Sequence, residues 1–283
     1  MPARPENEQK LRKKRTLASA LAAGCEDPAE LALLMAASFY SHLDVDAYLA
    51  LIDQYAERAR LRLGRARTPA RVISAINTVL FEEEGFRGNV DDYYDPRNSF
   101  LNEVLDSRRG IPISLSALYL AVAHRMKQPI SGVGLPLHFI VKYENSRGEL
   151  LIDPFNSGQI LTREECKERT EKAYGEPVEF QDSYLDSVPP RLMLYRMLTN
   201  LKFIYLKRLD FDRTGDIIDL MLEVEPNQPD EIRDRGLIHY QNGNWSGAAT
   251  RLQQYLEAFP GASDADAVVK RFEEAIERRA LLN

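Results

Sequence analysis

The segment from residue 136 to residue 155 constrains the fold more than any other part of the sequence. It reads PLHFIVKYENSRGELLIDPF, in which two runs rich in β-branched and aromatic residues, 138–143 and 150–152, flank a polar segment that contains a glycine. Two such runs around a short polar turn are typical of a β-hairpin. We therefore predict an antiparallel pair of strands with its turn at 144–149.

The predicted hairpin brings one histidine and one aspartate together. His138 begins the first run and Asp153 follows the second, and in an antiparallel pair the start of one strand lies beside the end of the next. A carboxylate beside an imidazole fixes the tautomer of the ring and stabilises its charged form, as in nucleophilic triads. The pair supplies two members of such a triad, so a catalytic site would need a nucleophile from elsewhere in the chain.

Length and composition indicate a soluble globular protein, with two domains more plausible than one. The chain has 283 residues, of which 44% are hydrophobic and 28% are charged. Its net charge of −6 gives no reason to expect nucleic acid as a partner, and no apolar run approaches the roughly 18 residues of a transmembrane helix. The acidic loop at 91–95 lacks the pattern of a calcium loop, so the sequence predicts no metal, no cofactor and no membrane partner.

The two cysteines bear on the cellular compartment. Cys25 and Cys166 do not make a disulfide framework, which favours the reducing cytoplasm. The segment 10–25 is basic, then weakly apolar, and ends in Gly-Cys, which leaves a lipid anchor on Cys25 as a minor alternative. The main expectation is a cytoplasmic protein whose residues 1–24 form a basic, flexible N-terminus.

Helical segments precede the predicted hairpin. Apolar periodicity and capping residues predict helices at 29–40, 45–63 and 69–81. The run 115–126 is almost uniformly apolar, so we expect it to be the buried central helix of its domain. Ser114 would lie at the positive end of that helix dipole, where an oxyanion or a thiolate is stabilised. A helix followed by strands predicts an α+β domain.

The last third of the sequence carries a weak repeat. Pro226 and Pro260 are 34 residues apart, and residues counted back from each of them take the small, aromatic and packing positions of the tetratricopeptide pattern. The predicted helices are 191–206, 211–224, 230–242, 245–259 and a capping helix at 264–280. Repeats of this kind usually present a groove to a peptide.

Three stretches of the sequence resemble the SirB-type transglutaminase-like family, which is bacterial. They are NSFLNEVLDSRRGIPISLS, GLPLHF and LIDPFNSG, and the resemblance covers roughly residues 25–275. It implies a transglutaminase-like (papain-like) core with a small antiparallel sheet, a helical N-terminal lobe and C-terminal tetratricopeptide repeats. With this organisation the chain divides into residues 1–24, a transglutaminase-like domain at 25–176, a connector at 177–190 and a repeat region at 191–283.

The sequence departs from the active enzymes of this superfamily at the nucleophile. Those enzymes carry Gly-x-Cys at the start of the central helix, and alignment on Gly110 places Pro112 at the cysteine position, or Ser114 if the alignment is shifted by two residues. Neither of them is a thiol, and neither cysteine of the chain has the chain position of the nucleophile. The tryptophan usual two residues after the histidine is Ile140 here.

Three interpretations of the site follow. In two of them the site is non-catalytic, either as a structural remnant or as a cleft that binds a peptide or a small ligand without chemistry. In the third, Ser114 is a nucleophile with His138 as its base and Asp153 as the orienting group, and the protein is an atypical hydrolase or acyltransferase. The residues expected near the cleft are Asn98, Asn102, Arg109 and Asn156.

The missing thiol favours the non-catalytic interpretations, because a serine hydroxyl is a much weaker nucleophile than a thiolate at neutral pH. We therefore predict a pseudoenzyme that serves as a protein-interaction or scaffold protein. Its protein or peptide partner is expected to bind through the helical repeats.

Overall fold

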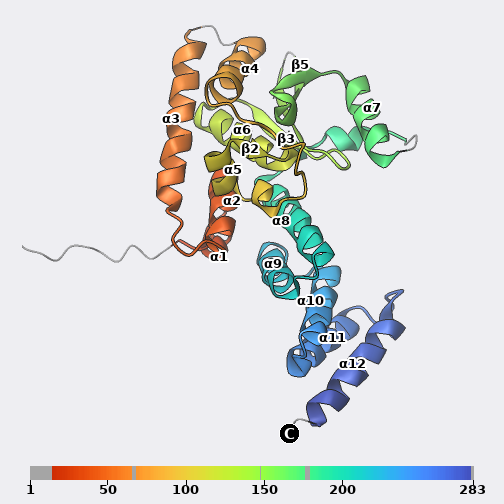
Figure 1. The fold of residues 1–283 in the computed structure, drawn as a ribbon. Coiled ribbons are helices and arrows are strands. Elements are labelled where there is room, and N and C mark those ends of the chain that lie inside the picture. Colours follow the sequence, from red (N-terminus) through yellow and green to blue (C-terminus); the bar gives the residue numbers. More distant parts are fainter. Residues whose placement is uncertain (1–14, 66–67, 147, 176–178, 282–283) are drawn as a thin grey trace, which may run out of the picture.

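The computed structural model describes residues 15–65, 68–146, 148–175 and 179–281. A helical lobe and a small sheet form one end of the molecule, and a stack of helices leads away from them to the C-terminus (Figure 1). The helices before the sheet are α1 (Leu17–Ala22), α2 (Pro28–Ala37), α3 (Val45–Leu63), α4 (Pro69–Asn77), a π-helix (Thr78–Glu83), a 3-10 helix (Pro96–Ser99), α5 (Leu101–Ser107) and α6 (Pro112–Arg125). The α+β class predicted from the sequence is confirmed.

Local capping sets the starts of the early helices. The Asp27 carboxylate accepts hydrogen bonds from the backbone of Ala29 and Glu30, with Pro28 in the first turn of α2, as an N-cap aspartate and a first-turn proline should. Helix α6 begins at Pro112, three residues earlier than the apolar run alone suggests. Because a proline at the first helical position loses no hydrogen bond, the helix extends back to it.

The sheet has five antiparallel strands in the order β6-β5-β4-β3-β7. The strands are β3 (Ile130–Val133), β4 (Ile140–Asn145), β5 (Gly148–Asp153), β6 (Gln159–Leu161) and β7 (Ser187–Val188), and a separate short parallel pair joins β1 (Arg87–Gly88) to β2 (Arg109–Gly110). The predicted hairpin is β4–β5, with Val141 opposite Ile152. His138 lies two residues before β4, in the turn that follows β3.

The two faces of the sheet bury different clusters, because successive side chains of a strand point to opposite sides. Val141 and Ile152 face the main core, which contains α6, whereas Ile140 and Leu151 join Cys166 in a smaller cluster under α7 (Arg163–Tyr174). Helix α7 and α6 thus cover opposite faces of the sheet (Figure 1). A 3-10 helix (Pro154–Asn156) follows β5 and another (Asp182–Leu185) precedes β7.

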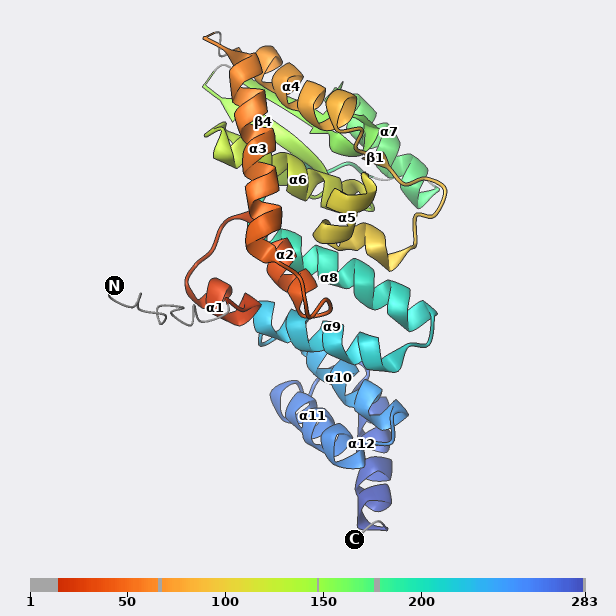
Figure 2. The same ribbon diagram turned by 60° about the vertical axis from the view of Figure 1, so that its left-hand side comes forward.

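Five helices form the C-terminal stack, and they agree closely with the repeat helices predicted from the sequence (Figure 2). They are α8 (Pro190–Lys207), α9 (Phe211–Val224), α10 (Pro229–Gln241), α11 (Trp245–Ala258) and α12 (Ala265–Ala280). Met193, Met197 and Leu201 of α8 belong to the same buried cluster as α6. Helix α8 is therefore a wall of the core that contains α6 as well as the beginning of the stack.

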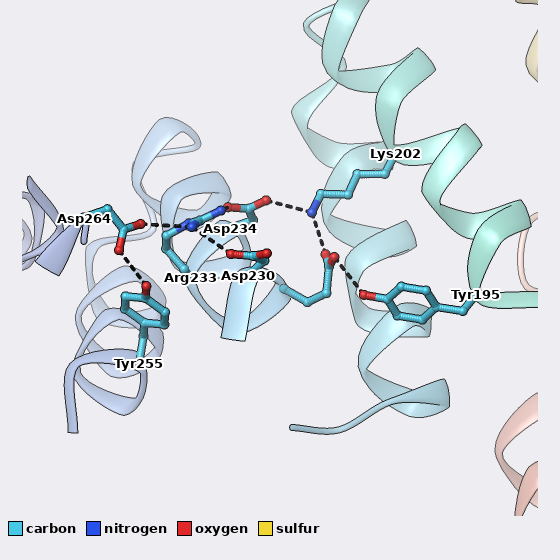
Figure 3. Close-up of polar contacts among 8 residues, drawn as sticks. Tyr195, Lys202, Asp230, Arg233, Asp234, Tyr255 and Asp264 are labelled. Atoms are coloured by element: carbon cyan, nitrogen blue, oxygen red, sulfur yellow. Dashed lines mark hydrogen bonds and ion pairs between the residues drawn. The ribbon is translucent and has the colours of Figure 1, made fainter. Parts of the chain in front are cut away.

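A chain of polar contacts joins α8 to α10 on the stack (Figure 3). Lys202 Nζ lies 2.6 Å from Glu231 Oε2 and 2.7 Å from Asp234 Oδ2, and the Tyr195 hydroxyl donates to Glu231 Oε1 at 3.0 Å. Lys202 and Glu231 are almost completely buried. Because a charge buried without a partner is costly, these pairs fix the position of α10 against α8.

The same chain continues from α10 towards α12. Arg233 is 2.9 Å from Asp230 and from Asp264 and 2.8 Å from Asp234, and the Tyr255 hydroxyl of α11 donates to Asp264 at 2.6 Å (Figure 3). Asp264 is the N-cap residue of α12. The contacts therefore tie the start of the last helix to the middle of the stack.

Replacing Lys202 with alanine is expected to lower the free energy of unfolding by about 2 kcal/mol, because the buried Glu231 then loses its cation and keeps the neutral Tyr195 hydroxyl as its partner. Urea unfolding measures the change. Lys167→Ala is the control, since its side chain is 40% exposed and lies 3.7 Å from Glu164, and such surface pairs contribute little. Equal effects of the two substitutions would contradict a structural role for the buried contacts.

None of the helices in the described part of the chain combines the length and the apolar character that a membrane crossing requires.

Candidate functional site

His138 and Asp153 meet at the end of the hairpin. Asp153 is the last residue of β5, and its Oδ2 lies 3.0 Å from His138 Nε2. The backbone of His138 is held in place as well, because its N–H donates to the Leu135 carbonyl at 3.2 Å. The sequence pattern placed these two side chains together, and the structure has them in contact.

Asp153 is a fully buried carboxylate with several donors around it. It accepts hydrogen bonds from Asn156 Nδ2 at 2.8 Å, from Arg169 at 2.9 Å and from the backbone N–H of Phe155 at 3.0 Å, in addition to His138. Burial alone would raise the pKa of Asp153, but these donors, with His138 foremost, outweigh it and hold the pKa below its ordinary value. The carboxyl group is therefore ionised at neutral pH.

The ionised carboxylate decides the state of the imidazole. A carboxylate only accepts hydrogen bonds, so the proton in the contact with Asp153 belongs to His138 Nε2. In the neutral ring Nδ1 is then the nitrogen with a free lone pair. The pair has the arrangement that a general base needs. Whether His138 can act as a base depends on which group faces its Nδ1 atom.

His138 lines a cleft of about 580 Å³. Its walls are the start of α6, the turn before β4, the loop that carries two adjacent tyrosines, and the exposed side of α8. The lining residues are Tyr93, Tyr94, Ile111, Pro112, Ile113, Leu137, His138, Phe139, Arg196, Thr199, Asn200, Phe203 and Ile204. The cleft therefore lies between the core around α6 and the helix α8.

Ser114 is absent from this lining and is fully buried. Its hydroxyl oxygen lies 2.6 Å from the Asn98 carbonyl oxygen and 3.1 Å from that of Ile111, and it accepts a hydrogen bond from the Ile111 N–H at 3.0 Å. No hydrogen bond between Ser114 and His138 exists among the described residues. A hydroxyl has one hydrogen to donate, and here backbone carbonyls take it, so the geometry does not support Ser114 as the nucleophile.

Of the two candidate positions, Pro112 is the one that lines the cleft, which His138 also lines. It is the first residue of α6, and Ser114 is the third. Two residues correspond to about 200° of rotation around a helix, so the two side chains point in nearly opposite directions. The candidate position that lines the cleft is thus occupied by a residue without any nucleophilic atom.

None of the four predicted binding residues lines the cleft. Asn98 is buried and donates to the carbonyls of Asp92 and Tyr93 at 2.7 and 3.2 Å, which shapes the loop that carries the tyrosines. Asn156 donates to Asp153 and so acts on the His138 pair indirectly.

Arg109 and Asn102 are further from the cleft chemistry. Arg109 pairs with the exposed Asp91 at 3.3 Å. Asn102 is buried, and its Oδ1 has no hydrogen-bond partner among the described residues. We find no physical role for it at the cleft.

The two cysteines do not supply the missing thiol. Cys166 lies in α7 on the opposite face of the sheet from α6, and burial raises its pKa to about 11. Cys25 lies between α1 and α2, where burial likewise raises its pKa and its thiol contacts Glu30. Neither lines the cleft, and both thiols are protonated at neutral pH, so neither has the character of a catalytic thiolate.

Sequence reasoning missed two arginines of the site. Arg169 of α7 contacts both Asp153 and Gln159 Oε1, and Arg196 of α8 lines the cleft. Arg196 belongs to a helix predicted from the sequence, but no local pattern says where α7 and α8 pack. The tetratricopeptide pattern assigned α8 to the repeats and gave no signal that it also forms a wall of the core.

The comparisons with known proteins agree with this architecture. A family model described as the transglutaminase-like superfamily matches residues 46–199, and one described as tetratricopeptide repeat matches residues 201–273. A UPF0162 protein of Xylella fastidiosa (strain 9a5c) is 39% identical over 84% of this chain and 85% of that protein. The chain is a UPF0162 (SirB-type) member of the transglutaminase-like superfamily.

Other relatives of this UPF0162 protein are more distant. A UPF0162 protein of Vibrio cholerae is 30% identical over 78% of this chain and 77% of that protein. Human F-box only protein 21 is 32% identical over 62% of this chain, a match that covers 29% of the human protein. The SirB-type resemblance found in the sequence is therefore confirmed.

Proposed function

We propose that this protein binds a peptide or protein partner in the cleft beside His138 and does not act on it chemically. The observation that carries the proposal is Pro112 at the cleft wall, together with a Ser114 hydroxyl that is directed at the Asn98 carbonyl. The transglutaminase-like domain and the tetratricopeptide repeats form an interaction architecture. In this proposal the protein works in the cytoplasm, where its two cysteines remain reduced.

The surface of the cleft is suited to binding. Leu137, Tyr94 and Phe203 are 64%, 59% and 48% exposed, and all three line the cleft. Contiguous exposed apolar side chains are costly in water, and such patches mark interaction sites. Tyr94 and Phe203 lie 6.4 Å apart between ring centroids, with the Lys207 ammonium over both rings. The aromatic pair joins the core to the repeat helix and forms the rim of the cleft.

One observation favours chemistry as the second candidate function. The contact between His138 and Asp153 has the geometry of a base and its orienting group, at 3.0 Å and with the carboxylate ionised. An atypical hydrolase or acyltransferase would need Ser114 to turn away from the Asn98 carbonyl and reach the cleft. The helical register of α6 counts against that movement.

Substitution of Phe203 tests the binding role. Peptides selected from a displayed library of random heptapeptides on the immobilised protein are labelled with fluorescein, and their dissociation constants are measured by fluorescence polarisation. Phe203→Ala is expected to weaken binding about tenfold, because exposed aromatic side chains at an apolar rim act as binding hot spots.

Leu192→Ala is the matched control for this experiment. Leu192 is on the same helix and is 46% exposed, but it does not line the cleft. Its substitution should leave the dissociation constants unchanged. Failure to select any peptide, or equal effects at the two positions, would count against the cleft as the binding site.

A further inference from the structure

The cleft is positively charged in a protein that is negatively charged as a whole. The net charge of the chain is −6, yet the residues that line the cleft include Arg196 and no aspartate or glutamate. The start of α6 lies in the same wall through Pro112 and Ile113, and the N-terminus of a helix carries a partial positive charge. An occupant of complementary charge is an anion.

Arg196 is held in a fixed position at the wall between α8 and the turn before β4. One of its terminal nitrogens, Nη2, donates to the carbonyls of Leu135 at 2.9 Å and His138 at 3.2 Å. Its guanidinium carbon lies 5.3 Å from the centroid of the Phe139 ring. A side chain at Gly134 would come within 2.1 Å of Nη1, so glycine at that position makes room for the arginine.

This guanidinium lacks an anionic partner within the described part of the chain. No carboxylate forms an ion pair with Arg196 there, and its Nε and Nη1 have no hydrogen-bond partner among those residues. Burial lowers the pKa of Arg196 from its ordinary value, which reflects the cost of a desolvated cation. A carboxylate in the cleft would offset that cost and use donors that the protein leaves free.

We propose that the cleft holds the C-terminal carboxylate of a peptide whose last side chain is apolar, with Arg196 as the anchor of the carboxylate. The inference rests on the proposed binding role of the cleft and adds the chemistry of the partner. Arg196 joins α8 to the turn before β4 and so bridges two walls, while the apolar rim at Tyr94 and Phe203 lies open to solvent. The C-terminus of a bound peptide would place its carboxylate at Arg196 and its last side chain against the apolar wall of the cleft. The preceding residues of the peptide would lie along the rim.

The test uses two pools of fluorescein-labelled peptides with the sequence Gly-Ser-Gly-X-X-Z, where X is any residue and Z is Leu, Ile, Val or Phe. One pool ends in a free carboxylate and the other in a carboxamide. Fluorescence polarisation against the full chain is expected to give about tenfold tighter binding for the free-acid pool, since a charge-assisted contact is lost in the amide.

The variant Asn200→Asp tests the charge of Arg196 without removing the contacts that hold its side chain. Asn200 lines the cleft next to Arg196 on α8, and a carboxylate there would pair with the arginine while leaving the contacts of Arg196 Nη2 intact. The preference for the free acid should disappear in this variant. Gln241→Glu adds the same charge on the exposed end of α10, outside the cleft, and should keep the preference.

The outcomes separate the two proposals. Equal binding of both pools that is weakened by Phe203→Ala would overturn the carboxylate anchor and leave the peptide cleft standing. A preference for the free acid that survives Asn200→Asp would also overturn the anchor. Binding of neither pool would contradict both proposals.

Discussion

Replacing Asp153 with alanine is expected to lower the free energy of unfolding by about 4 kcal/mol, because breaking a buried charged contact strands its partners. The carboxylate is completely buried and receives His138, Asn156 and Arg169 as well as two backbone N–H groups. The alanine variant leaves these donors without an acceptor at the end of the hairpin. Urea unfolding at pH 7 measures the loss.

The effect of Asp153 should depend on pH with a defined sign. The pKa of Asp153 is lower in the folded protein than its ordinary value, so its contribution is present above the unfolded pKa of about 3.9 and is lost as the pH falls towards the folded pKa. The difference between wild type and variant should narrow below about pH 4.

Asp182→Ala is the control for the Asp153 prediction, because the Asp182 side chain is 91% exposed and pairs with the half-exposed Arg163. Its stability should stay close to that of the wild type at every pH. If Asp153→Ala were as mild as this control, the buried carboxylate would not hold the hairpin end.

A Pro112→Cys variant should acquire a reactive thiol. The new side chain would face the cleft beside His138 at the start of α6, where the helix dipole and the imidazole stabilise a thiolate. Alkylation by iodoacetamide at pH 7 is expected to be roughly tenfold faster than that of a free thiol, and His138→Ala in the same background should slow it.

Ser114→Cys is the matched comparison for that variant. Ser114 is fully buried on the opposite side of the helix, so its cysteine should resist alkylation, as the buried Cys166 should in both proteins. A fast reaction at position 114 with none at position 112 would show that Ser114, and not Pro112, is the residue of α6 that faces the cleft.

The sequence predicted those parts of the fold that depend on local patterns. The hairpin followed from two β-rich runs around a glycine-containing turn, and α3 and α9 match the predicted ranges at both ends. The repeat helices followed from proline spacing and apolar periodicity. These signals are local because capping, turn formation and amphipathic burial act within a few residues of chain.

The contents of the site were harder to predict, because they depend on how distant elements pack. Ser114 looked like the start of the central helix, but α6 begins at Pro112, and Ser114 is its third residue and is buried in the core. Arg169 and Arg196 come from helices whose placement on the core no local pattern specifies. The strand β7 has two residues within the segment taken as a connector, which is too short for a periodic signal.

The proposal that the cleft binds a peptide without chemistry is tested most directly by the mass of the peptide after binding. The free-acid peptide pool is incubated with saturating wild-type protein and then examined by mass spectrometry, with Ser114→Ala and His138→Ala proteins in parallel. The account predicts that every peptide is recovered with its original mass from all three proteins. Cleaved or acyl-transferred peptide in the wild-type sample, lost in either variant, would show that the cleft is an active site.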